Sequence, residues 1–179
     1  MRSSDTSSID LRALIRDIPD FPKPGILFRD ITPLLGSGVA LRASIRQLCE
    51  RLAPSRPQLV AGIESRGFIF GSAVASEMGI GFVPIRKPGK LPWETRRESY
   101  ALEYGSDAIE VHADAFASGT RVALVDDLLA TGGTALAAVK LLQGLGAEIS
   151  VAAFVVELSA LQGRARLTDV SVESLITYP

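Results

Sequence analysis

Short apolar runs that alternate with helical segments are the feature that most limits how this chain can fold. Four runs are rich in Val, Ile, Leu, Ala and Phe and nearly free of charge, as strands buried on both faces of a parallel sheet are. They span residues 58–63, 81–85, 121–125 and 149–156. Between them, helices are predicted over residues 39–52, 67–78 and 133–145. The alternation predicts an α/β fold: a doubly wound, mainly parallel sheet flanked by helices.

Length and composition limit the class of protein further. The chain has 179 residues, of which 47% are hydrophobic and 22% charged, so we expect a single globular domain over residues 1–179. A net charge of −1 argues against a nucleic-acid partner. The longest uncharged stretch, residues 128–139, is shorter than the roughly 20 residues of a membrane-spanning helix. With no apolar core in the polar first ten residues, we expect no signal peptide, no membrane partner and a cytoplasmic location.

The segment over residues 87–105 departs from the pattern of strands and helices. It begins with Pro88 and Gly89 and carries many charges, which is typical of a functional lid; a solvated loop is the alternative. Near its end, Tyr100, Leu102 and Tyr104 alternate with polar or small residues, and a second alternation follows beyond residues 105–107. We therefore expect a flexible lid hairpin with its turn at residues 105–107.

The strongest chemical signal is the stretch RVALVDDLLATGGT, residues 121–134. A buried strand is followed by two aspartates and then by a turn of small residues that opens a helix. Glycines allow a close backbone approach to an anion, and a helix N-terminus supplies unpaired N–H groups and partial positive charge. The turn is therefore a predicted phosphate site, formed by Ala130, Thr131, Gly132, Gly133 and Thr134.

The aspartates narrow the class of phosphate compound. Asp126 and Asp127 would repel a bare polyphosphate, but they can accept hydrogen bonds from sugar hydroxyls or face a metal ion that arrives with the substrate. The sequence contains neither the P-loop pattern nor the dinucleotide pattern GxGxxG. The stretch resembles the phosphoribosyl pyrophosphate (PRPP) motif of type I phosphoribosyltransferases. In that family the two acids hold the ribose hydroxyls and the turn holds the 5′-phosphate; a structural strand-to-helix turn is the alternative.

Three other segments resemble the adenine phosphoribosyltransferase family in particular. They are FPKPGILFRDITPL (21–34), similar to its base-binding hood, ESRGF (64–68), similar to its pyrophosphate loop, and RKPGKLP with YALEYG (86–92 and 100–105), similar to its lid. The resemblance implies a hood of about residues 1–35 and a lid of about residues 87–105. It also implies that adenine and PRPP are converted to AMP and pyrophosphate by a homodimer. Mg²⁺ would be carried in by PRPP, without protein side chains as metal ligands.

The resemblance also implies roles for single residues. Phe28 would stack on the base while the backbone of Leu27 and Arg29 reads its edge; an ordinary core phenylalanine is the alternative. The lid glutamate, Glu103, would approach the purine as an acid, a base or a hydrogen-bond partner. Phosphate contacts are expected at Glu64 and Ser65, which a cis peptide bond would join. They are also expected from four cations: Arg66, as a catalytic residue, Arg86, Lys87 and Lys90. Ordinary surface roles are the alternative for these cations.

Two other functions fit the sequence less well. One is a phosphoribosyltransferase for another base, such as hypoxanthine, guanine or xanthine. The other is a regulator that binds PRPP without turnover, although the sequence shows no added DNA-binding domain.

Overall fold

The computed structural model describes residues 9–102 and 105–179, and it divides into two compact units between Gln47 and Leu48. The smaller unit contains a two-stranded antiparallel sheet in which Asp17 pairs with Arg29. Its elements are η2 (Arg12–Leu14), β1 (Arg16–Ile18), β2 (Phe28–Asp30), α1 (Thr32–Gly36) and the first part of α2 (Gly38–Leu52). The hood boundary near residue 35 and the assignment of residues 1–179 to one domain stay predictions.

The larger unit is built on a five-stranded parallel sheet with the order β4-β3-β7-β8-β9. An antiparallel hairpin, β5 with β6, forms a separate small sheet. The strands are β3 (Leu59–Ile63), β4 (Gly81–Ile85), β5 (Thr95–Leu102), β6 (Gly105–His112), β7 (Arg121–Leu129), β8 (Glu148–Leu158) and β9 (Ser171–Tyr178). The helical elements are the end of α2, η3 (Ala53–Ser55), α3 (Gly67–Met78), α4 (Gly133–Gly144), η4 (Ser159–Leu161) and η5 (Gly163–Arg166).

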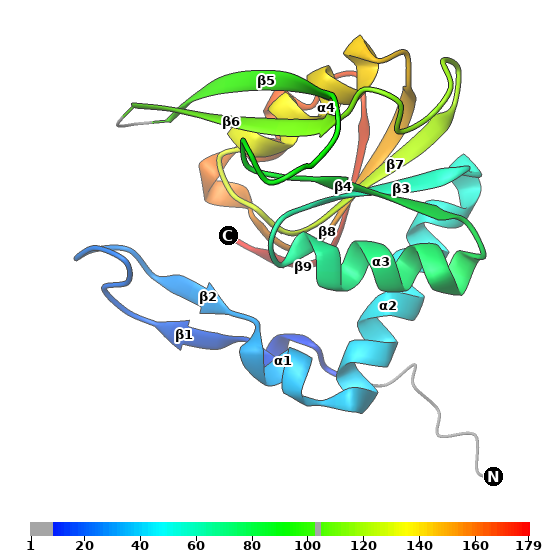
Figure 1. Ribbon diagram of the computed structural model, residues 1–179. Coiled ribbons are helices and arrows are strands. Elements are labelled where there is room, and N and C mark those ends of the chain that lie inside the picture. The colour runs from blue at the N-terminus through cyan, green and yellow to red at the C-terminus, as the bar shows by residue number, and fades with distance from the viewer. Residues whose placement is uncertain (1–8, 103–104) are drawn as a thin grey trace, which may run out of the picture. The chain divides into compact units, whose positions relative to one another are not determined.

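Helices cover both faces of this sheet, as expected for a doubly wound fold (Figure 1). Helix α3 packs on β3, β4 and β7, and α4 lies on the opposite face beneath the β5–β6 hairpin. The main apolar core joins Leu124 and Phe154 of the sheet to Leu142 of α4 and Ile109 of β6, all of which are buried. The hairpin is therefore part of the folded core on one side.

The predicted α/β class and elements are confirmed, and the sheet adds one strand. The three predicted helices and four predicted strands are present with boundaries within four residues at each end. Pro84 lies in β4, an edge strand, where its missing N–H breaks no ladder on the open side. Strand β9 was not predicted, because it contains Glu173 and alternates polar and apolar residues as an edge strand does.

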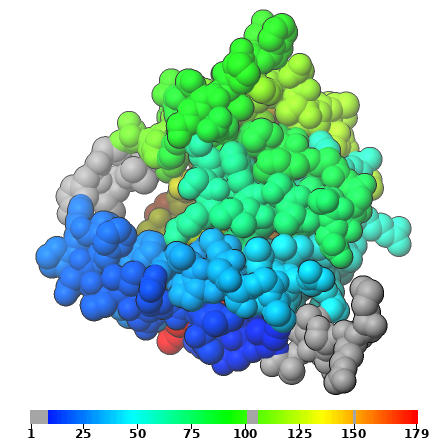
Figure 2. All heavy atoms as spheres, turned by 60° about the horizontal axis from the view of Figure 1, so that its bottom comes forward, coloured from blue at the N-terminus to red at the C-terminus, as the bar shows by residue number. Residues whose placement is uncertain are grey.

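The predicted turn of the hairpin is wrong. Residues 105–107 belong to β6 and pair with residues 100–102 of β5, in register from Leu102↔Gly105 to Tyr100↔Asp107. The glycine and aspartate that favoured a turn are thus strand residues, since cross-strand pairing continues through them. Glu103 and Tyr104 lie outside the described residues. In Figure 2 the green segment after β4 projects from the surface, and its Trp93 is 65% exposed.

Candidate active site

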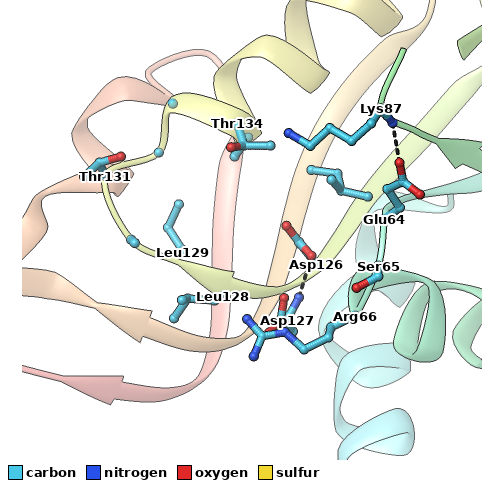
Figure 3. Close-up of a pocket in the computed structure, with 15 residues that line it drawn as sticks. Glu64, Ser65, Arg66, Lys87, Asp126, Asp127, Leu128, Leu129, Thr131 and Thr134 are labelled. Carbon is cyan, nitrogen blue, oxygen red and sulfur yellow. Dashed lines mark hydrogen bonds and ion pairs between the residues drawn. The ribbon is translucent and has the colours of Figure 1, made fainter. Parts of the chain in front are cut away.

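A cavity of about 390 Å³ in the larger unit lies at the carboxyl ends of β3 and β7 (Figure 3). Most of the predicted phosphate-site and PRPP-site residues line it together. They are Glu64, Ser65, Arg66, Lys87, Asp126, Asp127, Ala130, Thr131, Gly132, Gly133 and Thr134. Ile63, Leu128, Leu129 and Ala135 complete the lining. Ligands of open α/β sheets bind at this kind of edge.

The two aspartates lie where β7 runs past the end of its neighbour. Pairing between β3 and β7 ends at Gly62↔Val125, whereas β7 continues beside β8 to Leu129. Asp126 and Asp127 therefore have a strand on one side and the cavity on the other. In Figure 3 the Asp126 carboxylate points toward Thr134 and Lys87, while that of Asp127 meets Arg66.

Burial shifts the pKa values of both aspartates upward. Burial, together with the neighbouring charge of Asp127, raises the pKa of Asp126 well above its ordinary value. Burial also raises the pKa of Asp127, although the Arg66 guanidinium opposes that shift. Arg66 Nε lies 2.9 Å from Asp127 Oδ2. Hydrogen-bond donors or positive charge on a ligand would relieve the cost of holding both carboxylates here.

The predicted phosphate turn has the geometry of an anion cradle. Gly132 precedes α4 with φ +77°, a left-handed conformation that favours glycine, and α4 begins at Gly133. The first turn of a helix has N–H groups without intrahelical acceptors, and here it faces the cavity beside Thr131 and Thr134.

Gly163 supports this turn from behind, a role that the sequence did not predict. A Cβ on Gly163 would lie 2.2 Å from the Ala130 carbonyl oxygen and 2.9 Å from the Gly132 nitrogen. A Cβ on Gly132 would lie 2.5 Å from the Gly163 carbonyl oxygen. The two backbones therefore touch, and only glycines allow it. No local pattern could have revealed this contact, because it joins segments distant in the sequence.

Glu64 organises the cations at the other end of the cavity. The Glu64–Ser65 peptide bond is cis, as predicted. The Glu64 carboxylate accepts hydrogen bonds from the Lys87 backbone N–H, from Arg86 at 3.2 Å and from Lys90 at 3.3 Å. Burial alone would raise the pKa of Glu64, but these donors outweigh it and lower that pKa. Arg86 and Lys90 thus lie beside the site on the Glu64 carboxylate rather than in the cavity lining.

Three predicted base-site residues, Leu27, Phe28 and Arg29, lie in the smaller unit. Leu27 is exposed, and the Phe28 ring packs edge-on against Phe21 with centroids 5.2 Å apart. Arg29 forms an ion pair with Asp17 across the two-stranded sheet. Phe28 and Arg29 therefore belong to a locally ordered strand, β2. Their roles toward a base stay predictions, as does the role of Glu103, which lies outside the described residues.

Residues 9–102 and 105–179 contain no group of three or more His, Cys, Asp or Glu side chains placed to hold a metal ion. Within the same ranges no helix is long and apolar enough to cross a bilayer.

Comparison with known proteins identifies the class of protein that this fold and site define. Residues 31–176 match the phosphoribosyl transferase domain family, and the chain belongs to that family. Within it, curated proteins similar to this chain include adenine phosphoribosyltransferases. The one from Methylococcus capsulatus is 58% identical over 168 residues, covering 94% of this chain and 98% of that protein.

Solved structures agree with this assignment. The crystal structure of adenine phosphoribosyltransferase from Thermoanaerobacter pseudethanolicus has a TM-score of 0.92 and 49% identity, covering 94% of this chain and 98% of that one. The Saccharomyces cerevisiae enzyme, crystallised with adenine and an imino-altritol bisphosphate, has a TM-score of 0.87 and 40% identity, covering 92% and 96%.

Proposed function

We propose that this chain is an enzyme that converts adenine and PRPP to AMP and pyrophosphate. One observation carries the proposal: two acids, a half-buried Asp126 and a buried Asp127, shortly precede the turn that opens α4, and acids and turn line one cavity with Arg66 and Lys87. The relatives named adenine phosphoribosyltransferase, and the adenine bound to the yeast enzyme, support adenine as the base.

Each part of the cavity suits one part of PRPP. The turn at residues 131–134 would hold the 5′-phosphate, and the Asp126 and Asp127 carboxylates would accept hydrogen bonds from the ribose hydroxyls. The pyrophosphate would lie toward Ser65, Arg66 and Lys87, where positive charge stabilises a leaving anion. Arg86 and Lys90, gathered on Glu64 nearby, add to that positive field.

Magnesium fits this arrangement as part of the substrate. Asp126 and Asp127 are two carboxylates with raised pKa values and no third acidic or histidine ligand grouped with them in the described part of the chain. Mg²⁺ keeps several waters and binds substrate phosphates readily, so we propose that it is carried by PRPP oxygens rather than caged by the protein. Bound there, it would supply positive charge to the pyrophosphate.

The base would be read by the smaller unit and by the lid. Phe28 would stack on adenine, and the backbone of Leu27 and Arg29 would bond its edge. Glu103 would meet the purine as the lid closes and exchange or share a proton there. A cytoplasmic location and a homodimer remain parts of the proposal. Turnover of another purine base in place of adenine, or PRPP binding without turnover, would contradict the proposal.

Turnover by purified protein tests the proposal. With adenine, PRPP and Mg²⁺, we expect AMP and pyrophosphate to appear in equal amounts, since one glycosidic bond forms for each pyrophosphate released. Chromatography of the nucleotide and a coupled pyrophosphate assay measure the two products. PRPP binding without AMP formation would favour the regulator and contradict the enzyme.

Replacing Gly163 should displace the predicted phosphate turn, because Gly163 packs against its backbone. In Gly163→Ala the new methyl group would push the Ala130–Gly132 backbone away, and a misplacement of about 1 Å in a binding site can cost on the order of 100-fold. We expect kcat/KM for PRPP to fall by about that factor.

Gly144→Ala is the matched control, because a Cβ there meets nothing within 4 Å. It should keep the turnover of the unsubstituted enzyme. Equal kcat/KM values for the two variants would show that the contact between Gly163 and the turn does not shape the phosphate site.

A further inference from the structure

A hydrogen-bonded network of four polar side chains connects the two ends of the cavity. Two of its members, Tyr100 and Asp107, have no assigned role. Lys87 Nζ donates to Tyr100 Oη at 3.1 Å and to Asp107 Oδ2. Tyr100 Oη also donates to Asp107 Oδ2 at 3.2 Å, and Thr134 Oγ1 donates to Tyr100 Oη at 3.2 Å. The network thus runs from the predicted pyrophosphate end of the cavity to the predicted phosphate turn.

The β5–β6 hairpin fixes the geometry of this network. Tyr100 of β5 and Asp107 of β6 are directly opposite each other in the antiparallel ladder. Residues opposite each other on one face are close enough to act as a pair. Asp107 is anchored further because its Oδ1 accepts the Ala108 backbone N–H at 2.8 Å. Helix α4 packs against both hairpin strands, so Thr134 at its first turn is held within reach.

The charges favour a fixed Lys87 ammonium. Burial alone would lower the pKa of Lys87, but the bonds to Asp107 and Tyr100 outweigh it and raise that pKa. The bond from Lys87 is likewise the main reason that the pKa of Asp107 is lowered. An ammonium has three N–H donors, and Asp107 and Tyr100 accept two of them. A third remains to be directed at an anion, and in Figure 3 Lys87 extends along the cavity toward Thr134.

We propose that Asp107 and Tyr100 are positioning residues for PRPP: they hold the Lys87 ammonium over the cavity and tie it to the phosphate turn through Thr134. The proposal rests on the proposed function. A lysine side chain that is free in solution must lose its rotamer freedom when it binds an anion. Here the hairpin has already removed that freedom, so the binding of PRPP requires less ordering. Neither residue touches the base in this account.

The test compares Asp107→Asn with Asp114→Asn, an exposed aspartate outside the cavity lining. In Asp107→Asn we expect KM for PRPP to rise about tenfold, on the scale of the freedom that an untethered lysine regains. KM for adenine and the unfolding temperature should stay near those of the unsubstituted enzyme. Asp114→Asn should leave all three unchanged, and Asp107→Glu should restore part of the affinity.

A double-mutant cycle with Lys87→Met shows whether Asp107 acts through the lysine. If it does, Asp107→Asn should change KM for PRPP less than twofold once Lys87 is already methionine, because the interaction it supports is absent. A further tenfold rise in that background would overturn the positioning role, and so would a lower KM in the single variant, which would mean that Asp107 repels PRPP.

Tyr100→Phe keeps the test decisive if Asp107→Asn does not fold. It removes only the hydroxyl that accepts from Lys87 and Thr134, and it should raise KM for PRPP severalfold. An unchanged KM in Tyr100→Phe would contradict the proposal. A parent enzyme that makes no AMP would instead contradict the proposed function, so the two failures are distinguishable.

Discussion

The double variant Asp126→Asn, Asp127→Asn is expected to lose on the order of 1,000-fold in kcat/KM for PRPP while keeping its fold. Each carboxylate would accept a hydrogen bond from a ribose hydroxyl, and a hydrogen bond to a charged group is worth roughly 1.5–3 kcal/mol. Asparagine offers only a neutral amide oxygen in place of each carboxylate, and weakening both bonds to this extent corresponds to a factor of about 10² to 10⁴. Steady-state kinetics with varied PRPP at saturating adenine measures it.

The unfolding temperature of this double variant should rise slightly or stay unchanged, in contrast to its turnover. Burial raises the pKa of both aspartates, so above their ordinary pKa the two carboxyls favour the unfolded chain, in which water solvates them fully. Replacing them with asparagine removes this cost, although Arg66 then loses the Asp127 partner that lies 2.9 Å away. We expect an unfolding temperature close to that of the parent enzyme.

The matched control removes two charges elsewhere. Asp114 and Asp169 are both exposed, and Asp114→Asn with Asp169→Asn makes the same change in net charge. That control should retain full turnover. Unchanged turnover in the Asp126, Asp127 variant would refute their role toward the ribose, and a collapse of its unfolding temperature would assign them a structural role.

The sheet and the strand, turn and helix that begin at residue 121 were predictable because their signals are local, while the phosphate role of the turn stays a prediction. Residues 121–134 combine a buried strand, two acids and a glycine turn within one continuous stretch, and in the structure the acids and the turn line one cavity. The cis bond between Glu64 and Ser65 followed from the resemblance of residues 64–68 to a known loop.

Contacts between distant segments were not predictable. Gly163 meets the turn from 31 residues beyond Gly132, and nothing in its neighbourhood distinguishes it from an ordinary loop glycine. The sequence predicts a turn at Asp107 because Gly and Asp favour turns. In the structure, Asp107 is a strand residue opposite Tyr100. The register of a hairpin depends on pairing along both strands, which composition alone does not reveal.

The base preference should have the largest effect of all. Adenine presents an amino donor at position 6, where hypoxanthine and guanine present a carbonyl acceptor. A backbone carbonyl at Arg29 would accept from the amino group but would face the 6-oxo group as a second acceptor. A site built to hydrogen-bond one group can reject an analogue that lacks it by about 10⁴ to 10⁵.

The measurement that tests the central claim most directly is kcat/KM for adenine, hypoxanthine and guanine under one set of conditions, with PRPP and Mg²⁺ saturating. We expect AMP from adenine at a high rate, and IMP and GMP at rates lower by a factor of about 10⁴ or more. Comparable turnover of hypoxanthine or guanine would contradict adenine as the substrate, and no nucleotide from any of the three bases would contradict the enzyme itself.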